Sequence, residues 1–258
     1  MAPHVFQLDL NEKFPRLARP PIVEAAIHWQ ARAKAPWEPE QLRHALQQRL
    51  PDYPQCAILH EGFVATKFVP SQPESIEQNY SKRFQGFRLT AADGRHVLRF
   101  TRDGVVHSQV KDYEHWEAFR ESGETAWRVY CELAQPDGIQ RLSVRYINHF
   151  PSATAETLGD ILYEPPTRPE EMPLSDFVYQ STFTLPDHCL GVRIIKVMQP
   201  STPQQRQSSG LFLDLEVYST DILENDPATL ADRFGKMRWL KNKVFFTLLK
   251  PAALKQFE

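Results

Sequence analysis

The histidines and cysteines are the first residues to consider for chemistry, because the chain has nine of the former and three of the latter. Cys56 and His60 lie four residues apart, so on a strand both side chains would share a face and could supply two zinc ligands. No residue nearby supplies the other two ligands. The run from Asp187 to Cys189 combines the residue types of a nucleophile and its base, but it falls in a segment typical of a hairpin turn. The sequence therefore predicts no metal site and no catalytic residues.

Motifs that carry well-known enzyme chemistry do not occur in the sequence. It has no glycine-rich phosphate loop, GxSxG elbow, HExxH helix or CxxC pair. The absence of these motifs predicts no cofactor and favours a protein that is not an enzyme. Candidate binding surfaces are therefore the next features to examine.

The C-terminal segment 233–255 contains basic residues and no acidic one. Its apolar residues recur at spacings of three and four, as in an amphipathic helix. The simpler interpretation is a solvated face whose cations are favoured near the end of the helix. The alternative is a docking site for an acidic partner protein or a nucleic-acid backbone. The candidate residues of this basic helix are Arg233, Lys236, Arg238, Lys241 and Lys243.

Alternation along the predicted strands places a second set of polar residues on one face of a sheet, opposite the core. In an antiparallel sheet that is covered on one side, such residues form the solvated face. Arginine, histidine and carboxylate gathered there would also suit a polar ligand or a protein segment. The candidate binding residues are Glu24, His28, Arg88, Arg99, His107, Arg145 and His149, and Gln180, Thr182, Asp214 and Glu216 are expected on the same face.

The elements that would position these residues follow a similar order in both halves of the chain. In the first half we expect a strand at 22–31, a short helix at 39–50, a strand at 57–69 and a polar loop at 70–85. Asp-Gly pairs at 93–94 and 103–104 supply the positive φ angles of hairpin turns, so residues 87–110 should form a three-stranded meander. Asp112 is the expected N-cap of a helix that continues to about Ala134.

In the second half the strictly alternating segment 141–150 comes first, followed by a short helix near 155–162. Strands at 177–185, 189–198 and 211–218 come next. Asp226 and Pro227 should then cap and open a final helix at 227–250. The halves share element order and lengths more than residue identity, which is typical of a diverged internal repeat.

This order predicts an α+β fold, in which two pseudo-duplicated strand–helix–meander–helix halves form one antiparallel sheet with two long helices on one face. The layout is like that of TATA-binding-protein-like pseudo-dimers or helix-grip folds. Residues 1–21 would be an N-terminal arm, 22–138 the first half-repeat and 139–258 the second, together one compact unit. The residues expected in the core between sheet and helices are Trp116, Trp127, Phe234 and Leu240.

The leading strands of the two halves, 22–31 and 141–150, should be neighbours at the sheet centre if a pseudo-two-fold axis relates the halves. Residues on one face of adjacent antiparallel strands lie within reach of each other. We therefore expect an ion pair between Glu24 and Arg145, with His28 or His149 nearby.

Composition places few limits on function. With 41% hydrophobic and 24% charged residues, the chain resembles ordinary globular proteins. A net charge of -2 provides no strong overall field for nucleic acid or an acidic membrane. Three widely spaced cysteines are typical of reduced thiols, and the N-terminus lacks the pattern of a signal peptide. The sequence predicts a cytoplasmic protein with no membrane partner.

Three motifs carry a resemblance to a known family: PPIVEA at 20–25, RYIN at 145–148 and WLKNKVFF at 239–246. Together they resemble a sporadically distributed bacterial protein family of about this length with no assigned function. The resemblance covers nearly the whole chain, and it implies a bacterial origin and a scattered distribution typical of mobile elements. It implies no catalytic residues, because the family has none assigned.

The preferred hypothesis is a non-enzymatic binding or regulatory protein that holds a partner macromolecule through the open sheet face or the basic helix. The resemblance adds a role beside a toxin or defence effector, and a protein partner is favoured over nucleic acid. One alternative is a protein or enzyme that binds a small polar ligand in a cavity between sheet and helices, with His28, Arg145 and His149 as polar groups. Another is nucleic-acid binding through the basic helix.

Overall fold

The computed structural model describes residues 6–68, 76–167, 169, 172–199 and 209–258, and for 63–68 and 76–81 it describes only the backbone. In this part of the chain one antiparallel sheet of nine strands has the order β2-β3-β4-β5-β1-β6-β9-β8-β7. The strands are β1 (Ile22–Gln30), β2 (Gln55–Phe68), β3 (Ile76–Thr90), β4 (His96–Thr101), β5 (Gly104–Val110), β6 (Arg141–Phe150), β7 (Phe177–Leu185), β8 (Leu190–Gln199) and β9 (Gly210–Ser219). The helices are α1 (Pro39–Arg49), α2 (Trp116–Ala134), α3 (Leu158–Ile161), α4 (Pro227–Leu248) and α5 (Pro251–Leu254), with short 3₁₀ turns η1 (Pro186–His188) and η3 (Lys255–Phe257). The fold is therefore α+β.

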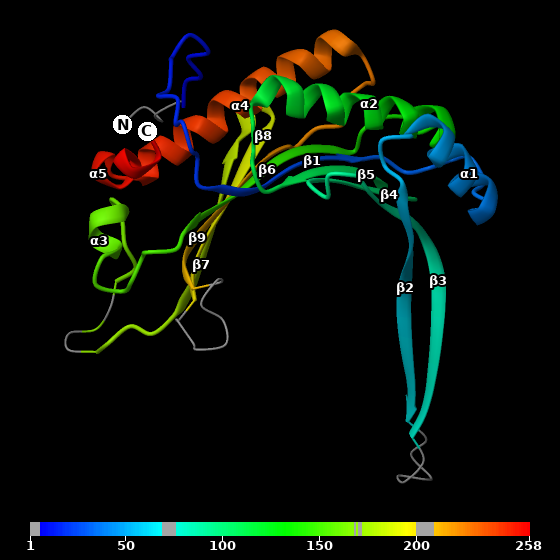
Figure 1. Ribbon diagram of the computed structural model, residues 1–258, viewed down its shortest axis with the longest axis horizontal. Coiled ribbons are helices and arrows are strands. Elements are labelled where there is room, and N and C mark those ends of the chain that lie inside the picture. The colour runs from blue at the N-terminus through cyan, green and yellow to red at the C-terminus, as the bar shows by residue number, and fades with distance from the viewer. Residues whose placement is uncertain (1–5, 69–75, 168, 170–171, 200–208) are drawn as a thin grey trace.

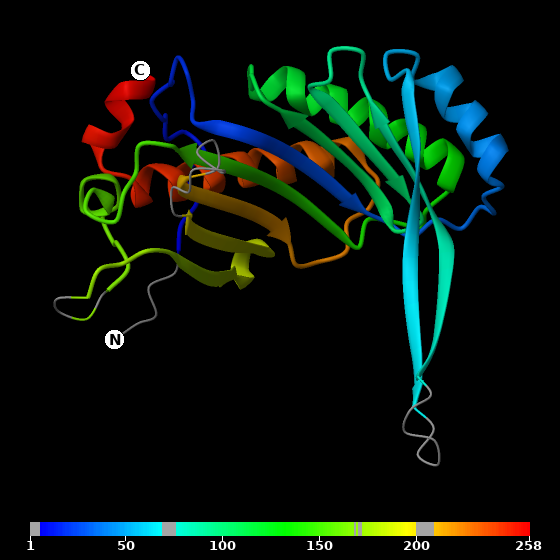
Figure 2. The ribbon, with the colours of Figure 1, turned by 60° about the horizontal axis from the view of Figure 1, so that its bottom comes forward.

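The sheet is arched, and the long helices α2 and α4 lie over its convex side (Figure 1). The long β2–β3 hairpin projects from one end of the arch, and β7, β8 and β9 bend away at the other. Seen from below, the strands lie in front of both long helices (Figure 2). In the described part of the chain the concave side of the sheet is thus open.

The strands expected at 22–31 and 141–150 lie side by side at the middle of the sheet, as expected for two halves related by a pseudo-two-fold axis. β1 and β6 are antiparallel neighbours, with Ala26 opposite Arg145. From β1 the strands β5, β4, β3 and β2 follow outwards, and from β6 the strands β9, β8 and β7 do so. In both halves the last strand of the sequence, β5 or β9, therefore lies beside the leading strand, and the strand that follows the leading strand in sequence, β2 or β7, lies at the edge.

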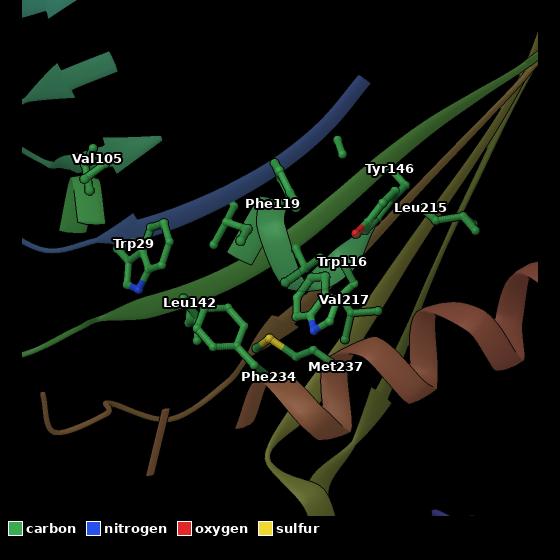
Figure 3. Packing of buried hydrophobic residues seen from close by; sticks show 14 of the residues in the cluster. Trp29, Val105, Trp116, Phe119, Leu142, Tyr146, Leu215, Val217, Phe234 and Met237 are labelled. Carbon is green, nitrogen blue, oxygen red and sulfur yellow. The ribbon is translucent and has the colours of Figure 1, made fainter. Parts of the chain in front are cut away.

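Trp29 of β1 joins both long helices to the sheet. Its ring stacks on Trp127 of α2 with centroids 6.0 Å apart, and it meets Phe234 of α4 edge-on at 5.8 Å. Figure 3 shows the ring of Phe234 between Trp29 and Trp116, and it meets each of them edge-on. The four residues expected there are all buried, which confirms the prediction: Trp116, Trp127, Phe234 and Leu240.

The start of α2 differs from the prediction. Asp112 has a φ angle of 44°, in the left-handed region, and so it is not the N-cap of the helix. Instead Nδ1 of His115 accepts a hydrogen bond of 3.2 Å from the backbone N–H of Ala118. Asp226 does cap α4, because its carboxylate accepts from the N–H of Thr229 at 2.8 Å.

The hairpins of the first half also depart from the prediction in detail. Residues 76–85, expected in a loop, belong to β3, while 69–75 lie outside the described residues. The meander of β3, β4 and β5 is present. Its second turn consists of Arg102 and Asp103, because Thr101 pairs with Gly104. Gly104 therefore opens β5 with a φ angle of 141°, where a side chain would be strained.

Two helix glycines provide a test of this packing. A Cβ at Gly123 of α2 would lie 2.8 Å from Cη2 of Trp29, whereas a Cβ at Gly235 of α4 would meet no atom within 4 Å. Alanine is favoured over glycine inside a helix by about 0.5–1 kcal/mol. We therefore expect Gly235→Ala to stabilise the fold by about that amount, and Gly123→Ala to destabilise it by about 1–3 kcal/mol through overpacking. Urea unfolding measures both, and a stabilised Gly123→Ala variant would contradict the close approach of α2 to β1.

Candidate functional site

The strand register shows which candidate residues share the concave face. Trp29 and every second residue before it on β1 face the helices. Glu24 and His28 lie between these positions and therefore face the open side. The pairing then carries this face across the sheet, from Arg145 to Glu216 and from Glu216 to Arg193. By register, the predicted residues on the concave face are Glu24, His28, Arg88, Arg99, Arg145, His149, Gln180, Thr182, Asp214 and Glu216.

Arg145 is bound to a different carboxylate from the one predicted. Its Nε and one terminal nitrogen donate to the two oxygens of Asp214 on β9, at 2.8 and 2.5 Å. This hydrogen-bonded pair raises the pKa of Arg145. Glu24 lies diagonally across the β1–β6 pair from Arg145, and it affects the pKa of Arg145 only through its charge. The predicted ion pair between Glu24 and Arg145 is therefore wrong, because Asp214 occupies one whole edge of the guanidinium group.

A second carboxylate on this face holds two arginines. Glu216 is buried, and it pairs with Arg141 at 3.0 Å and with Arg193 at 2.6 Å. The guanidinium of Arg141 also lies 4.1 Å from the ring centroid of Tyr218, a cation–π contact. Alternation already placed Arg141 on this face, but neither it nor Arg193 was among the predicted binding residues.

The part of the face nearer the β2–β3 hairpin has excess positive charge. Arg88 of β3 lies directly opposite Arg99 of β4, and both side chains are exposed. Within the described residues neither has a carboxylate partner. His28 of β1 lies in the same cross-strand row as Arg99, with Val106 of β5 between them. Burial, followed by the charge of Arg141, lowers the pKa of His28. This end of the face therefore holds like charges close together, which is unfavourable across a strand pair.

His149 has a local structural role on the same face. Its ring stacks on Phe212 of β9, with centroids 4.2 Å apart, and its Nε2 lies 2.7 Å from the carbonyl oxygen of Ser209. These contacts orient the ring along the sheet. His149 thus contacts none of the arginines of this face, which we call the arginine cluster: Arg88, Arg99, Arg141, Arg145 and Arg193.

His107 was predicted on the open face but lies on the convex side, beneath α2. It is fully buried, stacks on Phe119 at 5.0 Å and lies 3.4 Å from the hydroxyl of Ser122. Burial, with the charge of His96, lowers its pKa to about 3. The reason for the error is that β5 has apolar residues at both alternating positions, so its faces are determined only by its pairing with its neighbours. Val106 lies opposite His28 of β1 and Arg99 of β4, which leaves His107 on the other side.

Four of the five residues nominated on the basic helix form ion pairs. Arg233 holds Asp221 through two hydrogen bonds of 2.9 and 2.8 Å, and it donates to the carbonyl oxygen of Cys189 at 2.8 Å. Three further pairs, each of 2.7 Å, are Lys236–Asp232, Arg238–Glu117 and Lys243–Glu12. These cations hold the helix to its neighbours or to itself. The turn at Cys189 is likewise part of the packing around Arg233.

Lys241 is the exception on this helix. Its side chain points into a hollow between the N-terminal arm, the start of α2 and α4. Its ammonium nitrogen lies 4.1 Å from the ring centroid of Tyr146 of β6, and no described carboxylate pairs with it. Burial, together with the charge of Arg238, lowers the pKa of Lys241 to about 7.

Comparisons with known proteins do not assign a family. No protein-family model and no curated protein matches this chain in sequence. Over the residues that the structure describes, no three histidine, cysteine or acidic side chains gather as metal ligands would. Among those same residues, no helix has the length and apolar character needed to cross a membrane.

The burial of His107 predicts a pH dependence of stability. The folded protein binds a proton at this residue only near pH 3, whereas the unfolded chain does so near the ordinary value of 6.5. Its contribution is therefore fully present above pH 6.5 and is lost as the pH falls towards 3. We expect His107→Phe to lose less stability between pH 6.5 and 4.5 than the wild type, as measured by urea unfolding. The exposed His44→Phe is the control, and equal pH slopes for all three proteins would contradict the burial.

The pair between Arg145 and Asp214 predicts a second stability effect. Asp214 is nearly buried, so Arg145→Met should leave a carboxylate without its partner and cost about 1–3 kcal/mol. Adding Asp214→Leu should recover most of that loss. Lys236→Met, which breaks an exposed pair with Asp232, should change stability by less than about 0.5 kcal/mol. Thermal or urea unfolding distinguishes these outcomes, and a double variant no better than Arg145→Met would contradict the coupling.

Proposed function

We propose that this chain is a non-enzymatic binding or regulatory protein that holds an acidic segment of a partner protein on the concave face of its sheet. The observation that carries the proposal is the pair of facing arginines, Arg88 and Arg99, exposed and without a described carboxylate partner. Holding two like charges on adjacent strands costs stability. A bound carboxylate would remove that cost and would form charge-assisted hydrogen bonds with the guanidinium groups.

The rest of the face explains why the excess charge lies at one end. Asp214 is bound by Arg145, and Glu216 is shared by Arg141 and Arg193. The β6–β8 side is therefore largely neutralised within the protein. An acidic ligand would be drawn to the β3–β4 side, where the arginines have no such partners.

The composition of the face favours a protein over a nucleic acid. Apolar side chains stand between the charged ones, among them Val106, Ile147 and Ile195. Glu24, Asp214 and Glu216 would repel phosphates on the same face. Protein interfaces are typically mixed in this way and are enriched in arginine and tyrosine, whereas protein–DNA interfaces are much more positively charged.

We also infer that the two halves are diverged copies of one unit, with the layout of a TATA-binding-protein-like or helix-grip fold. The support is the central pairing of β1 with β6 and the matching outward order of the later strands. Two copies set side by side with the same curvature would produce one continuous arch. Such an arch presents a concave surface long enough for an extended segment.

Charge reversal at the facing arginines tests the proposed function. The probe is a fluorescent peptide rich in glutamate and tyrosine, and its binding is followed by anisotropy. We expect Arg88→Glu/Arg99→Glu to weaken binding by about tenfold or more, a change that corresponds to about 1.4 kcal/mol. The matched control is Arg120→Glu/Arg128→Glu on α2, on the convex side, which should bind like the wild type.

The same variants separate a protein partner from a nucleic acid. A duplex DNA of random sequence should bind weakly, and reversal of Arg88 and Arg99 should change that binding little. Strong, steeply salt-dependent DNA binding that is lost in the Arg88→Glu/Arg99→Glu protein would overturn the choice of partner. Equal binding of the acidic peptide by wild type and this variant would overturn the site itself.

A further inference from the structure

A hollow of about 880 Å³ lies on the convex side of the sheet, since Tyr146, which alternates with the concave-facing Arg145, lines it. It opens between the N-terminal arm, the start of α2 and the middle of α4. Tyr146 and Asn148 of β6 line it, as do Trp116 of α2 and Trp239 of α4. Its volume is within the range of small-molecule sites, which are also typically apolar with a few polar groups.

Lys241 lines this hollow without a carboxylate partner among the described residues. Its ammonium group contacts the face of the Tyr146 ring at 4.1 Å, and within the described residues it forms no ion pair or hydrogen bond. The nearby positive charge of Arg238 opposes its protonation, as burial does. The negative charge of an anion in the hollow would favour protonation and so oppose both effects.

The carboxylates that line the hollow are already bound to other cations. Glu12 of the arm pairs with Lys243 at 2.7 Å, and Glu114 lies 3.8 Å from Arg95. Glu117 pairs with Arg238 at 2.7 Å and lies 3.6 Å from Nδ1 of His115. The remaining charged groups of the lining are Lys13 and Arg16 of the arm, both exposed, and neither has a carboxylate partner among the described residues. The hollow thus has more available positive charge than negative.

A pair of tyrosines supplies a hydrogen-bond donor at the same place. The hydroxyls of Tyr113 and Tyr146 lie 3.0 Å apart, so one donates to the other. Burial raises the pKa of both, to about 12 for Tyr113 and well above its usual value for Tyr146. Both hydroxyls are therefore protonated at neutral pH, and the second hydrogen of the pair is free to bind a ligand.

We propose that this hollow binds a small organic anion, a carboxylate carried on an aromatic body. Lys241 would hold the carboxylate, with the free O–H of the Tyr113–Tyr146 pair as a second donor. Trp116, Trp239 and Phe245 would contact the aromatic body. The site lies on the opposite side of the sheet from the arginine cluster, so this inference is independent of the proposed function.

Binding of an anion to Lys241 is coupled to uptake of a proton. At pH 8 the free side chain is mostly neutral, since its pKa is about 7. A bound carboxylate raises that pKa, so the complex takes up a proton at pH 8 but hardly any at pH 6, where Lys241 is already charged. Affinity for the carboxylate should therefore fall as the pH rises above 7.

The test uses naphthalene-2-carboxylate and its neutral amide as probes, with isothermal titration calorimetry on the full chain. Titrations at pH 8 in phosphate and in Tris measure proton uptake, because these buffers differ in ionisation enthalpy. At pH 6 we expect the carboxylate to bind about tenfold more tightly than the amide, which corresponds to about 1.4 kcal/mol. At pH 8 we expect uptake of a proton with the carboxylate and none with the amide.

Variants assign the effect to Lys241. Lys241→Met keeps the length and apolar stem of the side chain, so it should fold, bind both probes equally and take up no proton. Lys236→Met on the exposed side of the same helix should behave as the wild type. The proposal is overturned if neither probe binds at millimolar concentration, if the two probes bind equally to the wild type, or if Lys241→Met keeps the preference for the carboxylate. Proton uptake that persists in Lys241→Met would place the titrating group elsewhere and would also overturn it.

Discussion

The contact of Trp29 with both long helices is the interaction on which the rest of the structure depends. Trp29 lies on the central strand and packs against Trp127 of α2 and Phe234 of α4. Its close approach to α2 is possible only because Gly123 has no side chain. Because both helices are held to the face of β1 that carries Trp29, the residues between these core positions, such as Glu24 and His28, must face the other side. The open concave face is therefore a consequence of how the core is packed.

Charges on that face are balanced unevenly along the arch. On the β6–β8 side, Asp214 and Glu216 lie beneath the arginines that bind them and are largely shielded from solvent. On the β3–β4 side, Arg88 and Arg99 face each other in solvent. Partly buried pairs rigidify the first region, whereas the second keeps guanidinium groups available for a ligand. Arginines with the same chemistry in the sequence are thus paired internally at one end of the arch and have no described carboxylate partner at the other.

Sequence patterns predicted the faces of β1 and β6 correctly, since most of the large apolar residues of both strands lie at alternate positions and the core needs one side only. They were insufficient where the alternation was ambiguous. In β5 apolar residues occupy both faces, and His107 was therefore assigned to the wrong one. The partner of Arg145 depended on strand order, because β9 had to lie beside β6 for Asp214 to reach it. A cavity between sheet and helices was one alternative, but the polar groups expected in it, His28, Arg145 and His149, lie on the other face of the sheet. The lining of the hollow could not be predicted, because its walls come from the arm, α2 and α4, which are distant in sequence.

The cations of α4 show how tertiary contacts divide a set that is uniform in sequence. Arg233, Arg238 and Lys243 connect the helix to other elements through carboxylates, and each such pair offsets part of the cost of removing its charges from water. Lys241 has no such partner in the described chain, although it faces into the molecule. A methionine would fill the same space without the desolvation cost of an amine. In the free protein the half-buried ammonium group of Lys241 is therefore balanced only by the Tyr146 ring and by solvent, whereas the other three cations have carboxylates.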